Sequence, residues 1–235
     1  MKKVISFSLW GNKPIYTIGA IKNAELALTM YPDFECWFYI HNRSVPIKIV
    51  NYLKSLPNVK IIIKSEDINI CKPMCWRFEA IDDPNVEIML SRDTDTRILL
   101  REKLAVDEWM NSNKSFHIMR DHPHHINTIM GGMFGVKKNI NIPSWRVLIN
   151  NIQQLSHRDY DQDFLNKYIY PIIKDDSIIH ASFHKFEAHA KPFPIAYDEY
   201  FRFVGGYVDE NDMISLKHQN ILKSYVHSSY KVYKL

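Results

Sequence analysis

The chain has 235 residues, with 30 Lys and Arg against 26 Asp and Glu, so its formal net charge is +4 when the 11 histidines are neutral. Hydrophobic residues make up 46% and charged residues 24% of the chain, which is the composition of a folded globular protein. With only 7 Gly and 11 Pro, a collagen-like, low-complexity or disordered chain is excluded. Because the basic residues are scattered rather than clustered, we expect no nucleic-acid partner.

Cysteine usage and hydropathy indicate the compartment. Cys36, Cys71 and Cys75 are an odd number in a long chain, which argues against a disulfide framework. The apolar run within residues 1–10 is shorter than the core of a signal peptide. No stretch approaches the roughly 20 apolar residues of a transmembrane helix. We therefore expect a soluble cytoplasmic protein without a transmembrane segment.

The first part of the chain alternates short apolar runs with helical periodicity. Runs typical of buried strands occupy residues 4–10, 36–40, 59–63 and 86–90. Apolar residues at helical spacing follow the first two runs, at residues 16–31 and 46–56. This alternation predicts a mostly parallel sheet flanked by helices, with right-handed crossovers.

The later segments extend the same pattern less regularly. They predict a helix at 99–110, strands at 116–119 and 132–136, a helix at 162–173 and a strand at 177–179, followed by an aromatic loop at 191–206. We predict one α/β domain over residues 1–235. Its nucleotide-binding half would cover about 1–97 and its acceptor half about 98–235.

Asp93-Thr94-Asp95 is the sharpest motif of the chain. Two carboxylates two residues apart on an extended segment point to the same side, so both can approach one hard divalent cation. The pair directly follows a predicted strand, and the carboxyl ends of strands form the ligand crevice of open α/β sheets. Arg92 and Arg97 flank it with groups that suit phosphate.

Several segments together resemble one group of enzymes. The strand-helix-strand-helix-strand pattern followed by Asp-x-Asp is similar to the GT-A fold of nucleotide-sugar glycosyltransferases. More specifically, the chain resembles the small members of that fold found in bacteria and large DNA viruses. The segments that carry this resemblance are residues 76–78, 91–97, 101–109, 117–123 and 131–135. The resemblance implies a hexosyltransferase-like enzyme of glycan biosynthesis, acting in the host cytoplasm if it is viral. It also implies a nucleotide-sugar donor, most simply a UDP-sugar, and a glycan or other hydroxyl acceptor.

The resemblance also assigns binding residues. It implies that Ser8, Leu9 and Trp10 contact the nucleoside and that Asp93 and Asp95 hold Mn²⁺ or Mg²⁺ and the diphosphate. Arg77 and Arg92 become candidate contacts to the diphosphate or sugar. A late histidine often completes such metal sites, and here His180, with His184 as the alternative, occupies the matching place. Gly131 and Gly132, at the start of a predicted strand, indicate close approach of the backbone to the sugar or acceptor.

An inverting transferase needs a carboxylate that accepts the proton of the acceptor hydroxyl. We favour Asp163, with Asp161 beside it, although acidic residues at a helix start also serve as caps. Asp121 competes because it follows a predicted strand end. In a retaining enzyme these aspartates would instead position hydroxyl groups.

Two enzymatic alternatives and one binding alternative stay open. The same carboxylates would serve a metal-dependent phosphohydrolase or nucleotidyltransferase, and an inert nucleotide-sugar or glycan-binding module would keep the pocket without turnover. His122, His124 and His125 invite a zinc hypothesis, but Pro123 and the adjacency of the last two disfavour convergence of all three. We therefore expect a turn with donor or acceptor contacts there.

Overall fold

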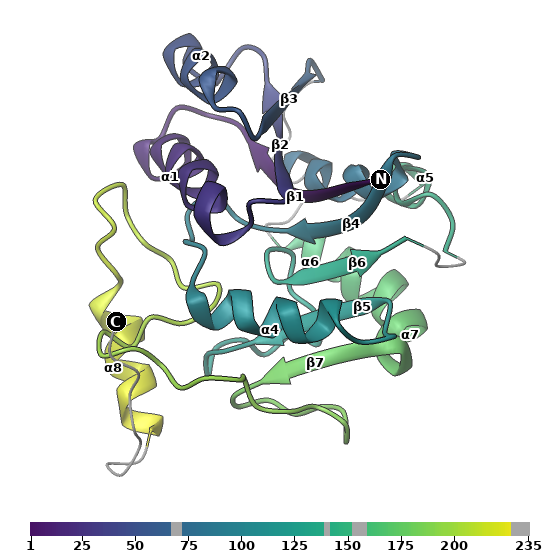
Figure 1. The fold of residues 1–235 in the computed structure, drawn as a ribbon, viewed down its shortest axis with the longest axis vertical. Helices are drawn as coiled ribbons and strands as arrows, with labels where there is room; N and C mark the ends of the chain where they lie inside the picture. Colours follow the sequence, from purple (N-terminus) through teal and green to yellow (C-terminus); the bar gives the residue numbers. More distant parts are fainter. Residues whose placement is uncertain (67–71, 139–141, 152–158, 227–235) are drawn as a thin grey trace.

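The computed structural model describes residues 1–66, 72–138, 142–151 and 159–226. These form a single seven-stranded sheet in the order β3-β2-β1-β4-β6-β5-β7 (Figure 1). The strands are β1 (Lys2–Leu9), β2 (Phe34–His41), β3 (Val59–Lys64), β4 (Val86–Ser91), β5 (Phe116–Arg120), β6 (Phe134–Lys137) and β7 (Ser177–Ala181). Only β6 runs antiparallel to its neighbours, so the predicted mostly parallel α/β sheet is confirmed.

Helical segments cover both faces of the sheet, with α1 and α4 in front of it in Figure 1 and α6 and α7 behind. The longer helices are α1 (Pro14–Met30), α2 (Ile47–Ser55), α4 (Leu100–Met110) and α8 (Leu216–Tyr225). The shorter segments are α3 (Lys72–Cys75), η1 (Trp76–Asp82), α5 (Trp145–Asn150), α6 (Tyr160–Phe164), η2 (Leu165–Ile169), α7 (Tyr170–Ile173) and η3 (Lys174–Asp176). Within the described residues, no helix combines the length and the hydropathy needed to cross a membrane.

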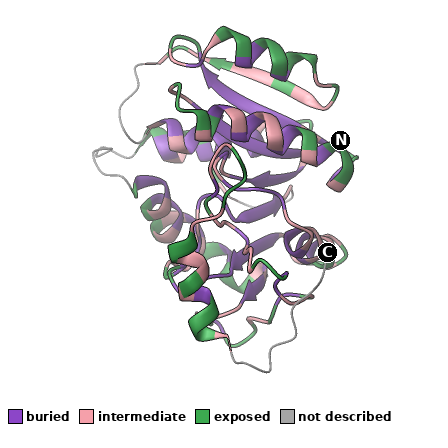
Figure 2. Cartoon of the chain, turned by 90° about the vertical axis from the view of Figure 1, so that its left-hand side faces the viewer, coloured by how far each residue is buried: buried purple, intermediate pink, exposed green. Residues whose placement is uncertain are grey.

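Alternation of side chains along the strands produces two large cores, one on each face of the sheet, and a smaller cluster forms around Met119 and Met133. On β1, Ile5, Phe7 and Leu9 pack toward α1 and α2. On the other face, Phe78, Phe134 and other aromatic residues from η1 and β6 form the second core. Figure 2 shows the resulting layers, with buried strands inside and exposed outer sides on the covering helices.

The predicted elements correspond to observed ones, apart from shifts at their ends. The long helix predicted at 162–173 is instead the succession α6, η2 and α7. Sequence periodicity did not indicate η1, α5 or α8, because each is short or carries few buried residues. Cys71 lies outside the described residues, while Cys36 and Cys75 are buried free thiols.

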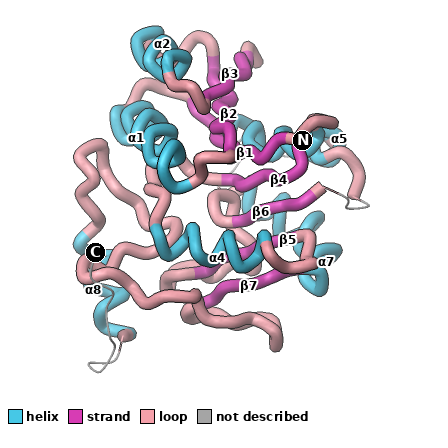
Figure 3. Tube along the Cα trace, in the orientation of Figure 1, coloured by secondary structure: helices cyan, strands magenta, loops and turns pink. Residues whose placement is uncertain are grey.

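Long loops and α8 gather at the carboxyl ends of the parallel strands (Figure 3). At this edge α1 approaches the loop that follows β4 very closely. A Cβ atom on Gly19 would lie 2.0 Å from the backbone oxygen of Thr94. Asn23, one turn later, donates from its side-chain amide to the Thr96 carbonyl at 2.8 Å. The helix therefore fixes the position of the Asp93–Asp95 loop through backbone contacts.

We predict that Gly19→Ala lowers the free energy of unfolding by about 1–3 kcal/mol, because the added methyl group must displace backbone rather than a flexible side chain. In an open helical position the same change would stabilise the protein, since Ala has the higher helix propensity. Urea unfolding measures the effect. Leu28→Ala, on the exposed side of α1, is the control and should change stability by less than about 0.5 kcal/mol. A stabilised Gly19→Ala variant would contradict the close contact.

Candidate active site

A cavity of about 840 Å³ opens at the carboxyl ends of β1 and β4. Its lining residues come from six parts of the chain: 8–16 at the end of β1 and the start of α1, 74–77 in α3 and η1, 93–96 after β4, 130–133 before β6, 159–162 at α6, and 205–207. Both predicted halves of the chain thus contribute to it. Of the expected donor-site residues, Ser8, Leu9, Trp10, Arg77 and Asp93 line this cavity.

Arg77 occupies the floor of the cavity, held through its backbone by β1. The Ser6 hydroxyl donates to the Arg77 carbonyl at 2.6 Å, and the Arg77 backbone N–H donates to Ser8 Oγ at 3.0 Å. Ser6 and Ser8 face η1 because they alternate along β1 with the apolar residues of the opposite core. Ser8 therefore positions Arg77 as well as lining the cavity.

The Arg77 guanidinium bridges two carboxylates from distant parts of the sequence. Nη1 donates to Asp93 Oδ1, and Nη2 donates to Asp161 Oδ2 at 2.8 Å. The Asp161 side chain is 4% exposed and the Asp93 side chain 38% exposed, so Asp93 is the partner that faces the open cavity. Burial opposes the charge of Arg77, but the two carboxylates outweigh it and raise its pKa.

Gly131 and Gly132 make room for this ion-pair cluster. A Cβ on Gly131 would lie 2.3 Å from Asp161 Oδ2, and a Cβ on Gly132 would lie 1.9 Å from Asp93 Oδ2. Only glycine at these two positions allows the carboxylates their observed places. The backbone at both glycines thus lies against protein side chains, and its approach to a sugar or acceptor stays a prediction.

Burial and like charge act against the ionised carboxylates. Burial, with the charge of Asp93, raises the pKa of Asp95 to about 6. The pKa of Asp161 is raised as well, by burial and then by Asp93, although Arg77 opposes this. Because a carboxylate with a raised pKa is destabilised in its ionised form, a bound cation would relieve the repulsion among these groups.

The donor set fits a hard divalent cation. Four aspartates line the cavity, Asp93, Asp95, Asp159 and Asp161, against the single cations Lys13 and Arg77, so the ionised lining carries a formal charge of −2. Carboxylate oxygens are the ligands that Mg²⁺ and Mn²⁺ prefer. Asp93 and Asp95 are the residues of this set that would hold the ion.

Arg92 and His180 do not lie where we expected. Arg92 is buried, and its Nε donates to Glu102 Oε1 of α4 at 2.6 Å. The His180 ring bonds to His117 Nε2 at 2.8 Å and to Glu108 Oε2 at 3.0 Å. Neither residue lines the cavity, so the donor contact expected of Arg92 and the metal contact expected of His180 are both wrong. For His180 the reason is topological, because β7 lies three strands away from β4. Arg92 follows β4, but its side chain turns toward α4, where Glu102 binds it.

His184 and Asp163 also lie away from the places where we expected them. The Nε2 atom of His184 bonds to the Pro123 carbonyl at 2.7 Å, away from the cavity lining. Asp163 is exposed, whereas Asp161 is buried and lines the cavity. Two residues along α6 turn a side chain to a different face, which separates these neighbouring aspartates.

Asp121 is a fully buried structural carboxylate rather than a cavity residue. Its Oδ1 accepts hydrogen bonds from Arg101 Nη2, Ser182 Oγ and Tyr197 OH at 2.8, 2.6 and 2.9 Å. Its Oδ2 accepts from Arg101 Nε at 2.9 Å and from the Val204 N–H at 3.0 Å. With five donors, it joins α4, β5, β7 and the loop near residue 200.

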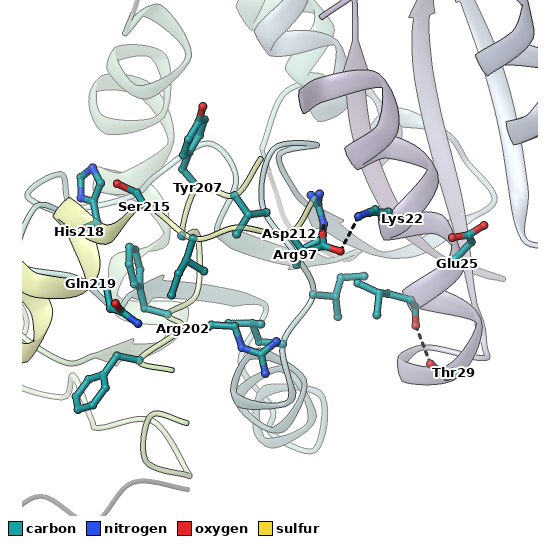
Figure 4. Close-up of a pocket in the computed structure, with 18 residues that line it drawn as sticks. Lys22, Glu25, Thr29, Arg97, Arg202, Tyr207, Asp212, Ser215, His218 and Gln219 are labelled. Atoms are coloured by element: carbon teal, nitrogen blue, oxygen red, sulfur yellow. Dashed lines mark hydrogen bonds and ion pairs between the residues drawn. The ribbon is translucent and has the colours of Figure 1, made fainter. Parts of the chain in front are cut away.

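A second cavity, of about 510 Å³, lies between α1 and α8 (Figure 4). Tyr207 lines both cavities, and Gly205 and Gly206 line the first and the second respectively. Phe201 and Phe203 give it aromatic surface, while Arg97 bonds to Asp212 at 2.7 Å within it. Sequence analysis missed this cavity because the loop after residue 200 carries no periodic pattern.

Comparison with known proteins adds information on the fold. No family model and no curated protein matches the sequence. Among solved structures, the chain is similar to a glycosyltransferase involved in glycosylation of the major capsid of PBCV-1, at 15% identity and a TM-score of 0.49, covering 77% of this chain and 82% of the other. It is similar to an active-site mutant of LgtC at 12% identity and a TM-score of 0.44, covering 79% and 81%.

The chain is also similar to 4-diphosphocytidyl-2C-methyl-D-erythritol synthase from Anaerococcus prevotii. The identity is 9% and the TM-score 0.50, with 81% of this chain and 92% of the synthase covered. At such identities a likeness concerns the fold alone. The chain therefore shares the fold of the synthase, and its mostly parallel sheet flanked by helices agrees with the predicted Rossmann-like GT-A fold.

We predict that Asp121→Asn lowers the free energy of unfolding by about 3–5 kcal/mol, because it leaves Arg101 buried without its charged partner. Chemical denaturation measures the loss. Asp33→Asn, at an exposed turn position, serves as the control and should stay within about 0.5 kcal/mol of the wild type. A variant of Asp121 with native stability would contradict the structural role.

A second prediction concerns Asp95. Because its pKa is raised to about 6 on folding from a usual value of 3.8, its ionisation destabilises the native state increasingly as the pH rises through this window. In metal-free buffer, Asp95→Asn should therefore stabilise the protein by about 1–2 kcal/mol above pH 7. The gain should shrink as the pH falls toward 4. Urea titrations at several pH values test this, and a gain independent of pH would contradict the electrostatic cause.

Proposed function

We propose that the chain is a metal-dependent glycosyltransferase that transfers a sugar from a nucleoside diphosphate donor, with UDP the expected nucleotide, to a hydroxyl group of a glycan. The charge of the large cavity carries the proposal. Its ionised lining has a formal charge of −2 and would repel a diphosphate. A divalent cation held by Asp93 and Asp95 would cancel this charge and place a positive centre where the diphosphate must sit. The Asp-x-Asp position at the end of β4 supports the same conclusion.

The remaining cavity residues suit the rest of the donor. Trp10, directly after β1, is half-buried and offers apolar surface for a base, whereas Leu9 before it packs into the core. Arg77 is bound to Asp93 in this structure, and a cation on Asp93 would free that guanidinium to pair with a phosphate. The metal would supply stabilisation of the charge on the leaving diphosphate.

Asp161 is the best-placed carboxylate for acid-base work among the three we considered. It lines the cavity, and burial raises its pKa, which makes it a stronger proton acceptor. In an inverting reaction the acceptor oxygen bonds to the anomeric carbon and the bond from that carbon to the diphosphate breaks. The proton of the acceptor hydroxyl passes to Asp161. The second cavity, which shares Tyr207 with the first, offers aromatic surface for the acceptor.

The test is a thermal-shift screen of nucleoside diphosphates and nucleotide sugars with and without Mn²⁺, followed by product analysis with the best donor. We expect a metal-dependent shift with one nucleotide, since a ligand that binds the native state stabilises it. The Asp93→Ala/Asp95→Ala double variant should lose the shift while keeping a native circular dichroism spectrum. A shift that survives in this variant would contradict the metal assignment.

Asp161→Asn should reduce transfer by about 100-fold or more, which is the usual contribution of a general base. Asp163→Asn is the matched control because it lies two residues away and faces out of the cavity. We expect its rate to stay within a few-fold of wild type. Equal losses in the two variants would overturn the choice of Asp161.

A nucleotidyltransferase is the second candidate, favoured by the fold likeness to the synthase at a TM-score of 0.50. The two activities differ in their products. A nucleotidyltransferase would consume a nucleoside triphosphate and a sugar phosphate and release pyrophosphate. Release of nucleoside diphosphate from a nucleotide sugar, without pyrophosphate formation, identifies the glycosyltransferase.

A further inference from the structure

Three histidines from two separate segments meet on the side of the molecule where α8 packs. His122 and His124 belong to the turn after β5, which a hydrogen bond from the His125 N–H to the His122 carbonyl closes at 2.9 Å. His218 lies in the first turn of α8. One side-chain nitrogen from each of the three residues lies within 4.8 Å of the others.

The rings surround a common point. The ring centroid of His122 is 5.1 Å from those of His124 and His218, which are 5.5 Å from each other. At a zinc–nitrogen distance of about 2.0–2.1 Å, tetrahedral coordination needs ligand nitrogens roughly 3.3 Å apart. His124 is exposed and His218 half-buried, so both rings have room to close this difference.

The hydrogen bonds of His122 already orient it as a ligand. Its Nε2 donates to the backbone carbonyl of His218 at 3.1 Å, which leaves the lone pair on Nδ1. That lone pair accepts a 3.1 Å hydrogen bond from the His124 N–H, which a metal ion would replace. An imidazole that donates one N–H to a carbonyl and offers the other nitrogen is the usual arrangement at metal sites.

An aromatic contact also holds one ligand of the cluster in place. Phe203 stacks on His122 with ring centroids 4.4 Å apart and restricts its rotation.

We propose that His122, His124 and His218 form a binding site for a borderline-soft transition-metal ion such as Zn²⁺, and that this ion fastens α8 to the turn after β5. Imidazole nitrogens select zinc, nickel or copper, whereas the carboxylates of Asp93 and Asp95 select magnesium or manganese. The two sites thus differ in both place and chemistry, and this one does not depend on the proposed transferase activity.

The packing of α8 explains what the ion would add. Leu222 is the buried residue of this helix as described, while Leu216 and Tyr225 are exposed. Figure 4 shows His218 and Gln219 at the α8 side of the second cavity, opposite Lys22 of α1. Fixing His218 would hold this wall of the cavity in place.

Zinc titration of the full-length chain by calorimetry, in excess Mg²⁺ to occupy the carboxylates, tests the site. We expect one bound Zn²⁺ per chain, weakened by about 10-fold or more in His218→Ala and in His124→Ala. His189→Ala is the control, because His189 is exposed and outside the cluster, and it should leave the affinity unchanged. Absent binding, or binding equally tight in His218→Ala, would overturn the proposal.

A second measurement tests the role of the ion without relying on affinity. Zn²⁺ should slow backbone hydrogen exchange over residues 216–225 in the wild type but not in His218→Ala. Melting curves in chelator should be closely similar for the two proteins, because His218 is only half-buried, and this separates loss of the metal from loss of the fold. Exchange that is indifferent to Zn²⁺ in the wild type would refute the fastening of α8.

Discussion

Three carboxylates, those of Asp93, Asp95 and Asp161, lie near a single buried cation, the Arg77 guanidinium. The rest of the site depends on this excess of negative charge. Arg77 pairs with Asp93 and Asp161, while burial and then the charge of Asp93 raise the pKa of Asp95 to about 6. One buried cation cannot neutralise three anions gathered around it. A further positive charge would complement the cluster, and the proposed diphosphate donor would need the same charge in order to enter.

The surrounding fold serves to hold this cluster in place. Ser6 and Ser8 fix the backbone of Arg77, and Gly131 and Gly132 leave space for the carboxylates that it binds. Gly19 lets α1 lie against the Asp93–Asp95 loop. These contacts involve the backbone and depend on short side chains or on the absence of a Cβ atom at glycine. They therefore constrain the geometry more firmly than long flexible side chains could.

Local patterns in the sequence predicted the fold well and the site in part. Apolar periodicity located the strands, and the place of Asp93 and Asp95 after β4 predicted their position at the carboxyl edge. Such local patterns could not predict contacts between segments that are distant in the sequence. The sequence could not show that Arg92 pairs with Glu102 in a buried contact or that His180 lies three strands away from β4.

The histidines likewise show that local spacing was informative and that contacts between distant segments could not be predicted. Adjacent spacing argued against convergence of His122, His124 and His125 as a set, and the cluster that forms omits His125. The missing partner is His218, which comes from a helix near the end of the chain that carries few buried residues.

Anomalous diffraction from crystals grown with Mn²⁺ and a nucleoside diphosphate most directly tests the proposed metal site at Asp93 and Asp95. A manganese peak within about 2.3 Å of a carboxylate oxygen of Asp93 or Asp95 is predicted. A bound nucleotide without such a peak, with Arg77 still paired to Asp93, would contradict it.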